Sequence, residues 1–241
     1  MKPIAFATII ALTISISAFA ADKPGAPPAK KPADPAFAKV EDVAGLPRVL
    51  LIGDSISIGY TAPVRELLKG KANVHRIPTN GGPTTHGLQN LKSWLGDSKW
   101  DVIHFNWGLH DLKYVKAGTG ELIQNTTEPG SHPQVPLADY EKNLTKLVGE
   151  LKATGAKLIW CSTTPVPEGA KGRVPGDEIK YNEAAARVMT AASVKTDDLY
   201  THAMTKIKEI QNKADVHYSA AGYKYLAEKV VAEIEAELPK K

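Results

Sequence analysis

The sequence predicts an α/β fold in which a parallel sheet carries helices on both faces. Short apolar runs alternate with helical patterns from about residue 46 onward, and this alternation is typical of parallel strands that are connected by helices. Segments rich in small, polar or reactive residues directly follow several of the apolar runs, at Ser55, 108–111 and 163–167. Because ligands bind beyond the carboxyl ends of parallel strands, these segments are expected to form a single site.

Strands are predicted where apolar runs are bounded by turn residues. The clearest runs cover residues 49–52, 74–77, 102–107 and 158–162. The first is typical of a short buried strand, because it is continuous and ends at a glycine. Residues 194–198 give a less apolar signal and predict a fifth strand.

Helices are predicted in the segments between and after these strands. The pattern is clearest over 137–153, where the leucine and valine side chains at 144, 147, 148 and 151 fall on one face. Ser219 is suited to the N-cap of the last helix, because its hydroxyl can accept a hydrogen bond from a free backbone N–H. The predicted helices cover residues 63–68, 86–95, 137–153, 178–192, 199–211 and 220–238.

Two segments that are rich in glycine, proline or both are expected to form walls of the site. The segment 112–136 is long and shows little helix or strand periodicity, and loops of this length are usually functional or disordered. Residues 169–176, which include Arg173, are the second candidate wall.

The first 20 residues are typical of a secretory signal peptide. Lys2 supplies a positive start, residues 4–19 are largely apolar, and Ala18-Phe19-Ala20 is a small-x-small cleavage pattern. We therefore expect cleavage after Ala20 and a periplasmic or secreted protein with no later membrane span. An uncleaved anchor helix is the alternative.

Residues 21–45 are rich in proline, alanine and lysine and are expected to form a flexible linker. The remaining segment, 46–241, is long enough for one domain with a hydrophobic core. The net charge of +4 comes largely from lysines near the two ends of the chain, so it does not indicate a nucleic-acid surface. Cys161 is the only cysteine, which excludes an intrachain disulfide.

Gly53-Asp54-Ser55 stands where the first apolar run stops. A serine on a sharp turn exposes its hydroxyl and becomes a nucleophile when a base takes its proton. Such a base is available at His217, and Asp215 stands close enough in the sequence to orient the imidazole. A nucleophile near the start of the domain and an acid–histidine pair near its end indicate a serine hydrolase.

These residues resemble the SGNH, or GDSL-type, hydrolase family, whose four sequence blocks occur here in order. The blocks correspond to Gly53-Asp54-Ser55-Ile56, residues 80–85, residues 108–111 and Asp215-Val216-His217. The resemblance implies a flavodoxin-like three-layer α/β/α fold with a five-stranded parallel sheet. It further implies that Ser55 is the nucleophile, that His217 is the base, and that the backbone N–H groups of Ser55 and Gly82 form the oxyanion hole.

The chain departs from the family pattern at two positions. The third block normally carries asparagine where this chain has His110, and the last block normally places the acid at the position of Ala214. A neutral imidazole carries one N–H donor, so we prefer His110 as the third oxyanion donor over the nearby Asn106. Asp215 remains the candidate acid, because residues two apart in an extended segment point to the same side.

Other polar residues near the blocks are candidates for support or substrate binding. Asp54, Asp111 and Asn106 belong to this group, and Asp111 is expected to orient His110 or to cap the turn. The spacings of His86 and His104 match no metal-ligand pattern, so no metal is expected. Cys161 is expected to be a small core residue.

The expected function is that of a secreted serine esterase that needs no cofactor. Export, the family resemblance and the absence of an obvious lipid-binding lid favour O-acetyl esters on carbohydrates, either small molecules or polysaccharides. One alternative is a lipase, thioesterase or lysophospholipase with an apolar acyl groove. Another is a degenerate domain that binds glycans without hydrolysing them. The oligomeric state stays open.

Overall fold

A five-stranded parallel sheet with the strand order β2-β1-β3-β6-β7 forms the centre of the fold. The computed structural model describes residues 34–124 and 126–240 of the chain. The side chains of β1 and β3 are almost wholly buried, as expected for strands covered on both faces. The strands are β1 (Arg48–Ile52), β2 (Asn73–Arg76), β3 (Val102–Phe105), β6 (Lys157–Cys161) and β7 (Lys195–Asp197).

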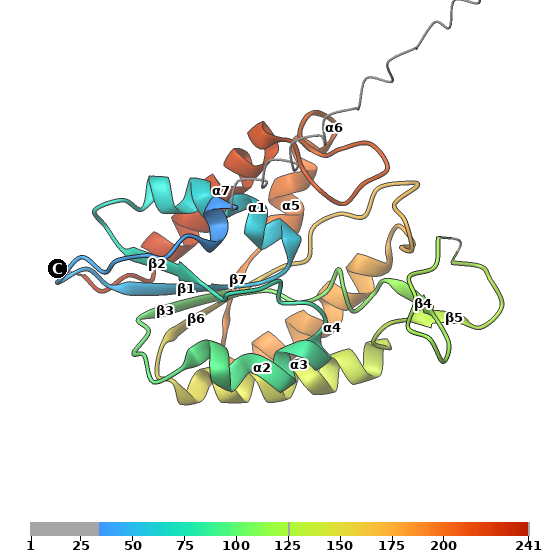
Figure 1. Cartoon of the computed structure of the whole chain (residues 1–241), viewed down its shortest axis with the longest axis horizontal. Helices are drawn as coiled ribbons and strands as arrows, with labels where there is room; N and C mark the ends of the chain where they lie inside the picture. The colour runs from blue at the N-terminus through green and yellow to red at the C-terminus, as the bar shows by residue number, and fades with distance from the viewer. Residues whose placement is uncertain (1–33, 125, 241) are drawn as a thin grey trace, which may run out of the picture. The chain divides into compact units, whose positions relative to one another are not determined.

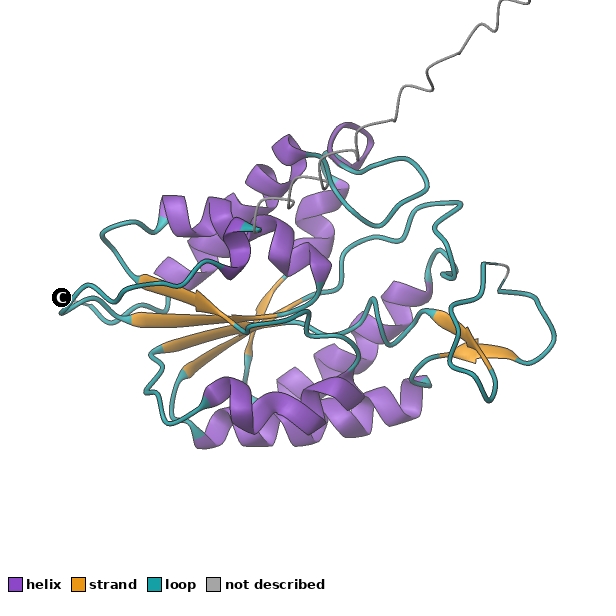
Figure 2. Ribbon diagram, viewed as in Figure 1, coloured by secondary structure: helices purple, strands orange, loops and turns teal. Residues whose placement is uncertain are grey.

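Helices cover both faces of this sheet, which confirms the predicted three-layer α/β/α fold (Figures 1 and 2). One layer contains α1 (Ser55–Leu67), α5 (Leu199–Met204), α6 (Ile207–Ile210) and α7 (Ala220–Glu235). The other contains α2 (Thr84–Leu95), α3 (Leu137–Ala153) and α4 (Asp177–Ala192). As predicted, Ser219 is the N-cap of α7, and its hydroxyl accepts a hydrogen bond from the N–H of Gly222 at 3.1 Å.

Helix α1 begins at Ser55, well before the start that the sequence predicts at Pro63. The serines and glycine of its first turns have low helix propensity, which hides the start. Asp54 compensates for this by capping the helix, since its Oδ1 accepts a hydrogen bond from the N–H of Ile56 at 2.9 Å. The strand-to-helix turn therefore places Ser55 in the first helical position.

The prediction of one continuous helix over 199–211 is wrong, because the structure has two short helices there, α5 and α6. At the break, the Thr205 hydroxyl donates to the carbonyl of His202 at 2.7 Å. A threonine that bonds to a nearby backbone carbonyl competes with helix continuation. Lys206 then leaves the helical region, with φ −130° and ψ 18°.

The predicted loop over 112–136 contains a small antiparallel hairpin of β4 (Tyr114–Lys116) and β5 (Ser131–Pro133). Strands of three residues are too short to leave a periodic pattern in the sequence. The hairpin is attached to the other predicted wall, because the Tyr114 N–H donates to the Gly172 carbonyl at 2.7 Å.

The predicted signal peptide and the first part of the predicted linker lie outside the described residues. From Asp34 onward the linker segment is in contact with the domain: Pro35–Phe37 form a 3-10 helix in which Ala36 is buried. Arg65 of α1 donates to the Pro35 carbonyl at 2.9 Å. Within the described part of the chain, no helix is both long and apolar enough to cross a membrane.

Candidate active site

The turn between β1 and α1 presents Ser55 at the carboxyl end of the sheet. Ser55 is the first residue of α1, and its backbone N–H has no hydrogen-bond acceptor among the described residues. The N-terminus of a helix carries free N–H groups and a partial positive charge, and both favour a negative charge placed there. The serine hydroxyl and a site suited to an anion therefore lie next to each other.

Ser55, His217 and Asp215 form one hydrogen-bonded chain. His217 Nε2 lies 2.8 Å from Ser55 Oγ, and His217 Nδ1 lies 2.7 Å from Asp215 Oδ1. A neutral ring that donates from Nδ1 to the carboxylate leaves Nε2 free to accept the serine proton. The structure thus brings together the three residues that the sequence analysis selected for catalysis.

A tight loop explains how an acid only two residues before the histidine reaches its ring. The Asn212 N–H donates to the His217 carbonyl at 2.9 Å and closes the loop. Ala214 has φ +54°, a left-handed conformation that is unusual for a residue other than glycine. Asp215 Oδ1 also accepts from the backbone N–H of His217 at 3.2 Å. The carboxylate is therefore held by the backbone as well as by the ring.

The hydrogen bonds around Asp215 stabilise its charged form. Partial burial by itself raises the pKa of Asp215. Hydrogen bonds from the ring and backbone N–H of His217 and from the backbone N–H of Val216, together with the charge that the ring carries when protonated, outweigh that effect. The pKa of Asp215 consequently lies below its ordinary value. Asp215 is therefore a carboxylate at neutral pH, as an acceptor behind the imidazole must be.

Gly82 lies in the loop that flanks the serine turn. The neighbouring Gly81 N–H donates to the Gly53 carbonyl at 2.9 Å, which ties this loop to the turn. Gly82 has φ +60°, where an L side chain would be strained. Its N–H donates to Asn80 Oδ1 at 2.9 Å. An oxyanion can accept from the Gly82 N–H only by sharing this donor with Asn80 or by displacing the Asn80 side chain.

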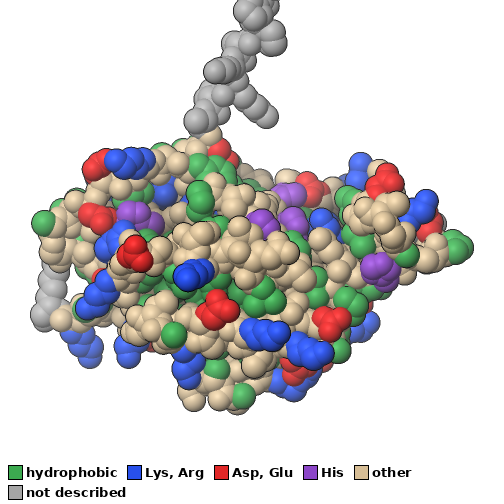
Figure 3. All heavy atoms as spheres, turned by 60° about the horizontal axis from the view of Figure 1, so that its bottom comes forward, with side chains coloured by type: hydrophobic (Ala, Val, Ile, Leu, Met, Phe, Trp, Pro, Cys, Tyr) green, Lys and Arg blue, Asp and Glu red, His purple; other side chains and the backbone are tan. Residues whose placement is uncertain are grey.

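His110 is half-buried, and its ring has no hydrogen bond to any described residue. Burial lowers the pKa of His110, and the charges of Lys113, Arg173 and His217 lower it further, although Asp54 opposes them. The ring is therefore neutral at pH 7 and carries one donor. Histidine side chains gather on the face shown in Figure 3.

Asp111 supports helix α2 and does not orient His110, which corrects that expectation. Its Oδ1 accepts from the Thr84 N–H at 2.8 Å and from the Thr84 hydroxyl at 2.6 Å. Burial raises the pKa of Asp111 to about 7, and Oδ2 has no partner among the described residues. Full burial also excludes direct contact with substrate.

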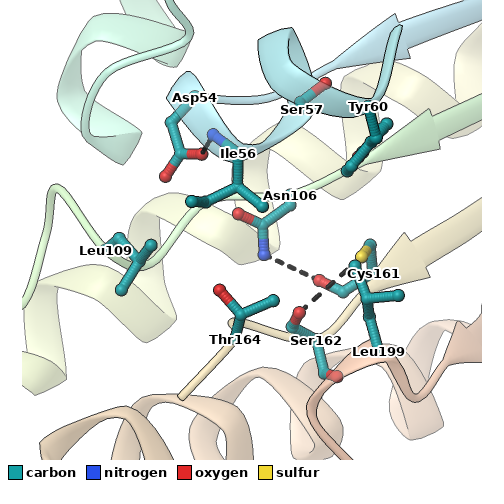
Figure 4. A pocket seen from close by; sticks show the side chains of 10 residues that line it. All are labelled: Asp54, Ile56, Ser57, Tyr60, Asn106, Leu109, Cys161, Ser162, Thr164 and Leu199. Atoms are coloured by element: carbon teal, nitrogen blue, oxygen red, sulfur yellow. Dashed lines mark hydrogen bonds between the residues drawn. The ribbon is translucent and has the colours of Figure 1, made fainter. Parts of the chain in front are cut away.

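Asn106 points across the end of the sheet, as Figure 4 shows. Its amide donates to the Cys161 carbonyl at 2.7 Å and lies 3.4 Å from the Thr163 hydroxyl. The internal cavity beside it has a volume of about 10 Å³, roughly the space for one water molecule. Asn106 is therefore committed to joining strand ends, and this cavity is too small for an ester substrate.

Arg76 is a supporting residue that could not be identified from the sequence. At the end of β2, its guanidinium donates to the Gly53 carbonyl at 3.1 Å and to the Ser57 hydroxyl at 3.2 Å. Burial lowers the pKa of Arg76 to about 10, so the side chain remains a cation. A basic residue at the end of a predicted strand was the only sequence signal for this role. Its partners could not be predicted, because they are distant in the sequence.

Residues 51–225, more than half of the chain, match the GDSL-like Lipase/Acylhydrolase family. No curated protein matches the sequence. Several solved structures share the fold. A lipase/acylhydrolase from Enterococcus faecalis has a TM-score of 0.65 and 20% identity, covering 81% of this chain and 99% of its own.

Two acetyl xylan esterases are also similar in structure. One is AlAXEase, with a TM-score of 0.61 and 16% identity over 78% of this chain and 99% of its own. The other is Axe2 from Geobacillus stearothermophilus, with a TM-score of 0.62 and 18% identity over 78% of this chain and 94% of its own. At such identities the likeness concerns the fold.

Proposed function

Because this chain belongs to the GDSL-like Lipase/Acylhydrolase family, we propose that it is a serine esterase that forms an acyl-enzyme on Ser55. The observation that carries the proposal is the hydrogen-bonded chain from Ser55 Oγ through the ring of His217 to Asp215. This arrangement provides a nucleophile, a base and an acid that orients the base. The degenerate glycan-binding alternative does not need such alignment.

In the proposed mechanism, His217 Nε2 takes the proton of Ser55 as the hydroxyl oxygen attacks the ester carbonyl. The His217 cation that forms is stabilised by the Asp215 carboxylate. It then gives the proton to the departing alcohol, which leaves an acyl group on Ser55. Water, deprotonated by the same ring, attacks this acyl group, and the ring gives the proton to the Ser55 oxygen as the acid leaves.

The tetrahedral oxyanion needs donors directed at the position where its charge develops. The free N–H of Ser55 is the first donor, and it lies at the N-terminus of α1. Gly82 is the second, if the oxyanion competes with Asn80 for its N–H. His110 stands where the family has asparagine, and we propose that its neutral ring supplies the third.

Replacing His110 tests this third donor. We expect His110→Ala to lower kcat by about 10²–10³-fold, the usual cost of losing an oxyanion donor. His110→Asn should recover part of this loss, because its amide restores a donor near the same place. The measurement is kcat for an aryl acetate. A His110→Ala variant with nearly unchanged kcat would exclude the ring from the oxyanion hole.

We propose O-acetyl esters on carbohydrates as the substrates and export as the protein's route. The acetyl xylan esterases among the similar structures support the acetyl group, and the pattern of the first 20 residues supports export. Acyl esters of longer chain are the second candidate, which the similarity to the Enterococcus faecalis lipase/acylhydrolase supports.

Labelling with a serine-directed fluorophosphonate tests the catalytic proposal. We expect intact-mass analysis to show one adduct, and peptide mapping to place it on Ser55. The Ser55→Ala variant should remain unlabelled. Folded wild-type protein that gains no mass would favour the glycan-binding alternative.

A series of aryl esters with lengthening acyl chains tests the substrate proposal. We expect kcat/KM to be highest for acetate and to fall as the chain grows. A maximum at eight carbons or more would replace the acetylesterase proposal with the lipase alternative.

A further inference from the structure

Arg173 is a fixed cation beside the third sequence block. Its Nε donates to the Leu109 carbonyl at 3.0 Å and Nη1 donates to the Lys171 carbonyl at 3.3 Å. No described carboxylate lies within the 4.0 Å ion-pair distance of its guanidinium. A guanidinium has five N–H donors, so several remain available for a ligand. The carbonyl of Leu109 directly precedes His110, so this cation lies beside the residue that we propose as the third oxyanion donor.

Lys113 is a second cation on the same wall. It is half-buried, and its ammonium group has neither a hydrogen bond nor an ion pair with any described residue. The Tyr114 N–H donates to the Gly172 carbonyl at 2.7 Å, so the segments that carry Lys113 and Arg173 run side by side. The charges of both residues act on the ring of His110. Lys113 is three residues after His110 and Arg173 is hydrogen-bonded to the residue before His110, so both cations are attached to this segment of the site.

Acidic groups near these cations already have other partners. Arg173 feels the charges of Asp54 and Asp215, but Asp54 caps α1 and Asp215 holds the ring of His217. Burial lowers the pKa of both Lys113 and Arg173, and each cation lacks an ion-pair partner to compensate for lost hydration. A bound anion would supply that compensation.

We propose that Lys113 and Arg173 form a subsite for a carboxylate on the substrate, placed next to the ester that Ser55 attacks. This inference rests on the proposed esterase function and narrows its substrate class to acidic esters, such as O-acetylated uronic acids. A planar carboxylate matches the fork of a guanidinium and accepts two parallel hydrogen bonds from it. Lys113 adds a second positive charge from the neighbouring segment.

The test compares esters that differ only in the carboxylate. One pair is acetylated methyl galacturonoside and acetylated methyl galactoside, which places the charge on the sugar. The other pair is aryl hemisuccinate and aryl butyrate, which places it on the acyl group. We expect kcat/KM to be about tenfold higher for the acidic member of one pair, mainly through KM. The pair that shows the preference identifies the side of the ester that the subsite contacts.

Variants of Lys113 and Arg173 then test whether these residues cause the preference for the acidic ester. Lys113→Gln should reduce the acidic-to-neutral ratio of kcat/KM several-fold, and so should 0.5 M salt. Arg173→Lys keeps the charge but loses the fork, and it should reduce the ratio while preserving some preference. Lys146→Gln, which removes an exposed charge from α3, is the matched control and should leave the ratio unchanged.

Two outcomes separate failure of the subsite from failure of the esterase proposal. Turnover that depends on Ser55 but shows equal kcat/KM within both pairs would overturn the subsite and leave the esterase intact. If no ester is hydrolysed, titration of Ser55→Ala protein with galacturonate and galactose oligosaccharides still decides the matter for a sugar carboxylate. Binding of the acidic oligosaccharide that weakens in a Ser55→Ala/Lys113→Gln protein supports the subsite, and equal affinity for both oligosaccharides overturns it.

Discussion

Two of the fold's histidine–aspartate pairs have similar distances and opposite surroundings. His217 Nδ1 lies 2.7 Å from Asp215 Oδ1, with side chains 41% and 47% exposed. His104 Nε2 lies 3.0 Å from Asp197 Oδ2, and both side chains are fully buried. The first pair lies beyond the strand ends, whereas the second joins β3 to β7 within the sheet.

The second pair even has a potential nucleophile close by. The ligand-type atoms of His104, Cys161 and Asp197 lie within 4.8 Å of one another. Burial raises the pKa of the Cys161 thiol well above its ordinary value, so it remains neutral and unreactive. A histidine, an acid and a thiol that are buried in the core in this way have no access to a substrate.

The largest expected effect is the loss of kcat when the exposed pair or its serine partner is changed. Ser55→Ala and His217→Ala should each lower kcat by about 10⁴–10⁶-fold, because each removes a group that acts directly on the reacting atoms. Their urea unfolding curves should stay close to that of the wild type. Ser93→Ala removes an exposed hydroxyl from α2 and should retain most of the turnover. Retained activity in either Ser55→Ala or His217→Ala would exclude the proposed mechanism.

Asp215→Asn should have the next largest effect on turnover. It replaces the carboxylate that accepts from His217 Nδ1, so the ring loses its preferred tautomer and the stabilisation of its cation. We expect kcat to fall by about 10²–10⁴-fold, measured at saturating aryl acetate. A change of less than threefold would show that the backbone loop alone orients His217.

The buried pair should instead respond in stability. His104→Ala leaves Asp197 without its partner in the core, and breaking a buried pair costs about 3–5 kcal/mol. We expect the free energy of unfolding to fall by that amount in urea titrations, while kcat per folded molecule stays near the wild-type value. Loss of kcat without loss of stability would assign His104 a role in catalysis.

Asp111 sharpens the comparison, because it is a buried acid without a histidine. In the folded protein the Asp111 carboxyl stays protonated up to about pH 7, whereas the ordinary pKa of an aspartate is 3.8. Between these values the native state binds more protons than the unfolded chain, so this carboxyl makes the fold less stable as pH rises. The slope approaches about 1.4 kcal/mol per pH unit.

The Asp111→Asn variant isolates this contribution. Its amide oxygen can still accept from Thr84, but it does not titrate. We expect the stability of the variant relative to wild type to increase between pH 4 and 7, measured by urea unfolding at several pH values. A stability difference that stays constant over this range would show that Asp111 is ionised throughout.

Much of the fold could be predicted because strand and helix signals are local. The four apolar runs correspond to β1, β2, β3 and β6, and the prediction of helix 137–153 agrees with the bounds of α3. The start of α1 could not be predicted from periodicity, since a cap and packing outweigh the low propensity of its first turns. The hairpin of β4 and β5 depends on a tertiary contact, the hydrogen bond from Tyr114 to Gly172. The break between α5 and α6 depends on a side-chain contact, the hydrogen bond from Thr205 to His202.

The candidate site was only partly accessible to sequence reasoning. Ser55 and His217 could be selected because one follows a strand and the other follows an acid. The contacts of Arg76 with the serine turn and of Asp111 with Thr84 could not be predicted, because their partners are distant in the sequence. Each joins groups whose distance is set by strand order and loop shape.

The amino-acid sequence alone determined the alternating α/β order and the candidate residue types at the strand ends, because apolar runs and block motifs are local. Tertiary structure decided that the ring of His217 meets the serine hydroxyl, and that the acid two residues away reaches this ring. Those outcomes depend on burial and on the left-handed turn at Ala214, which only the packed chain establishes.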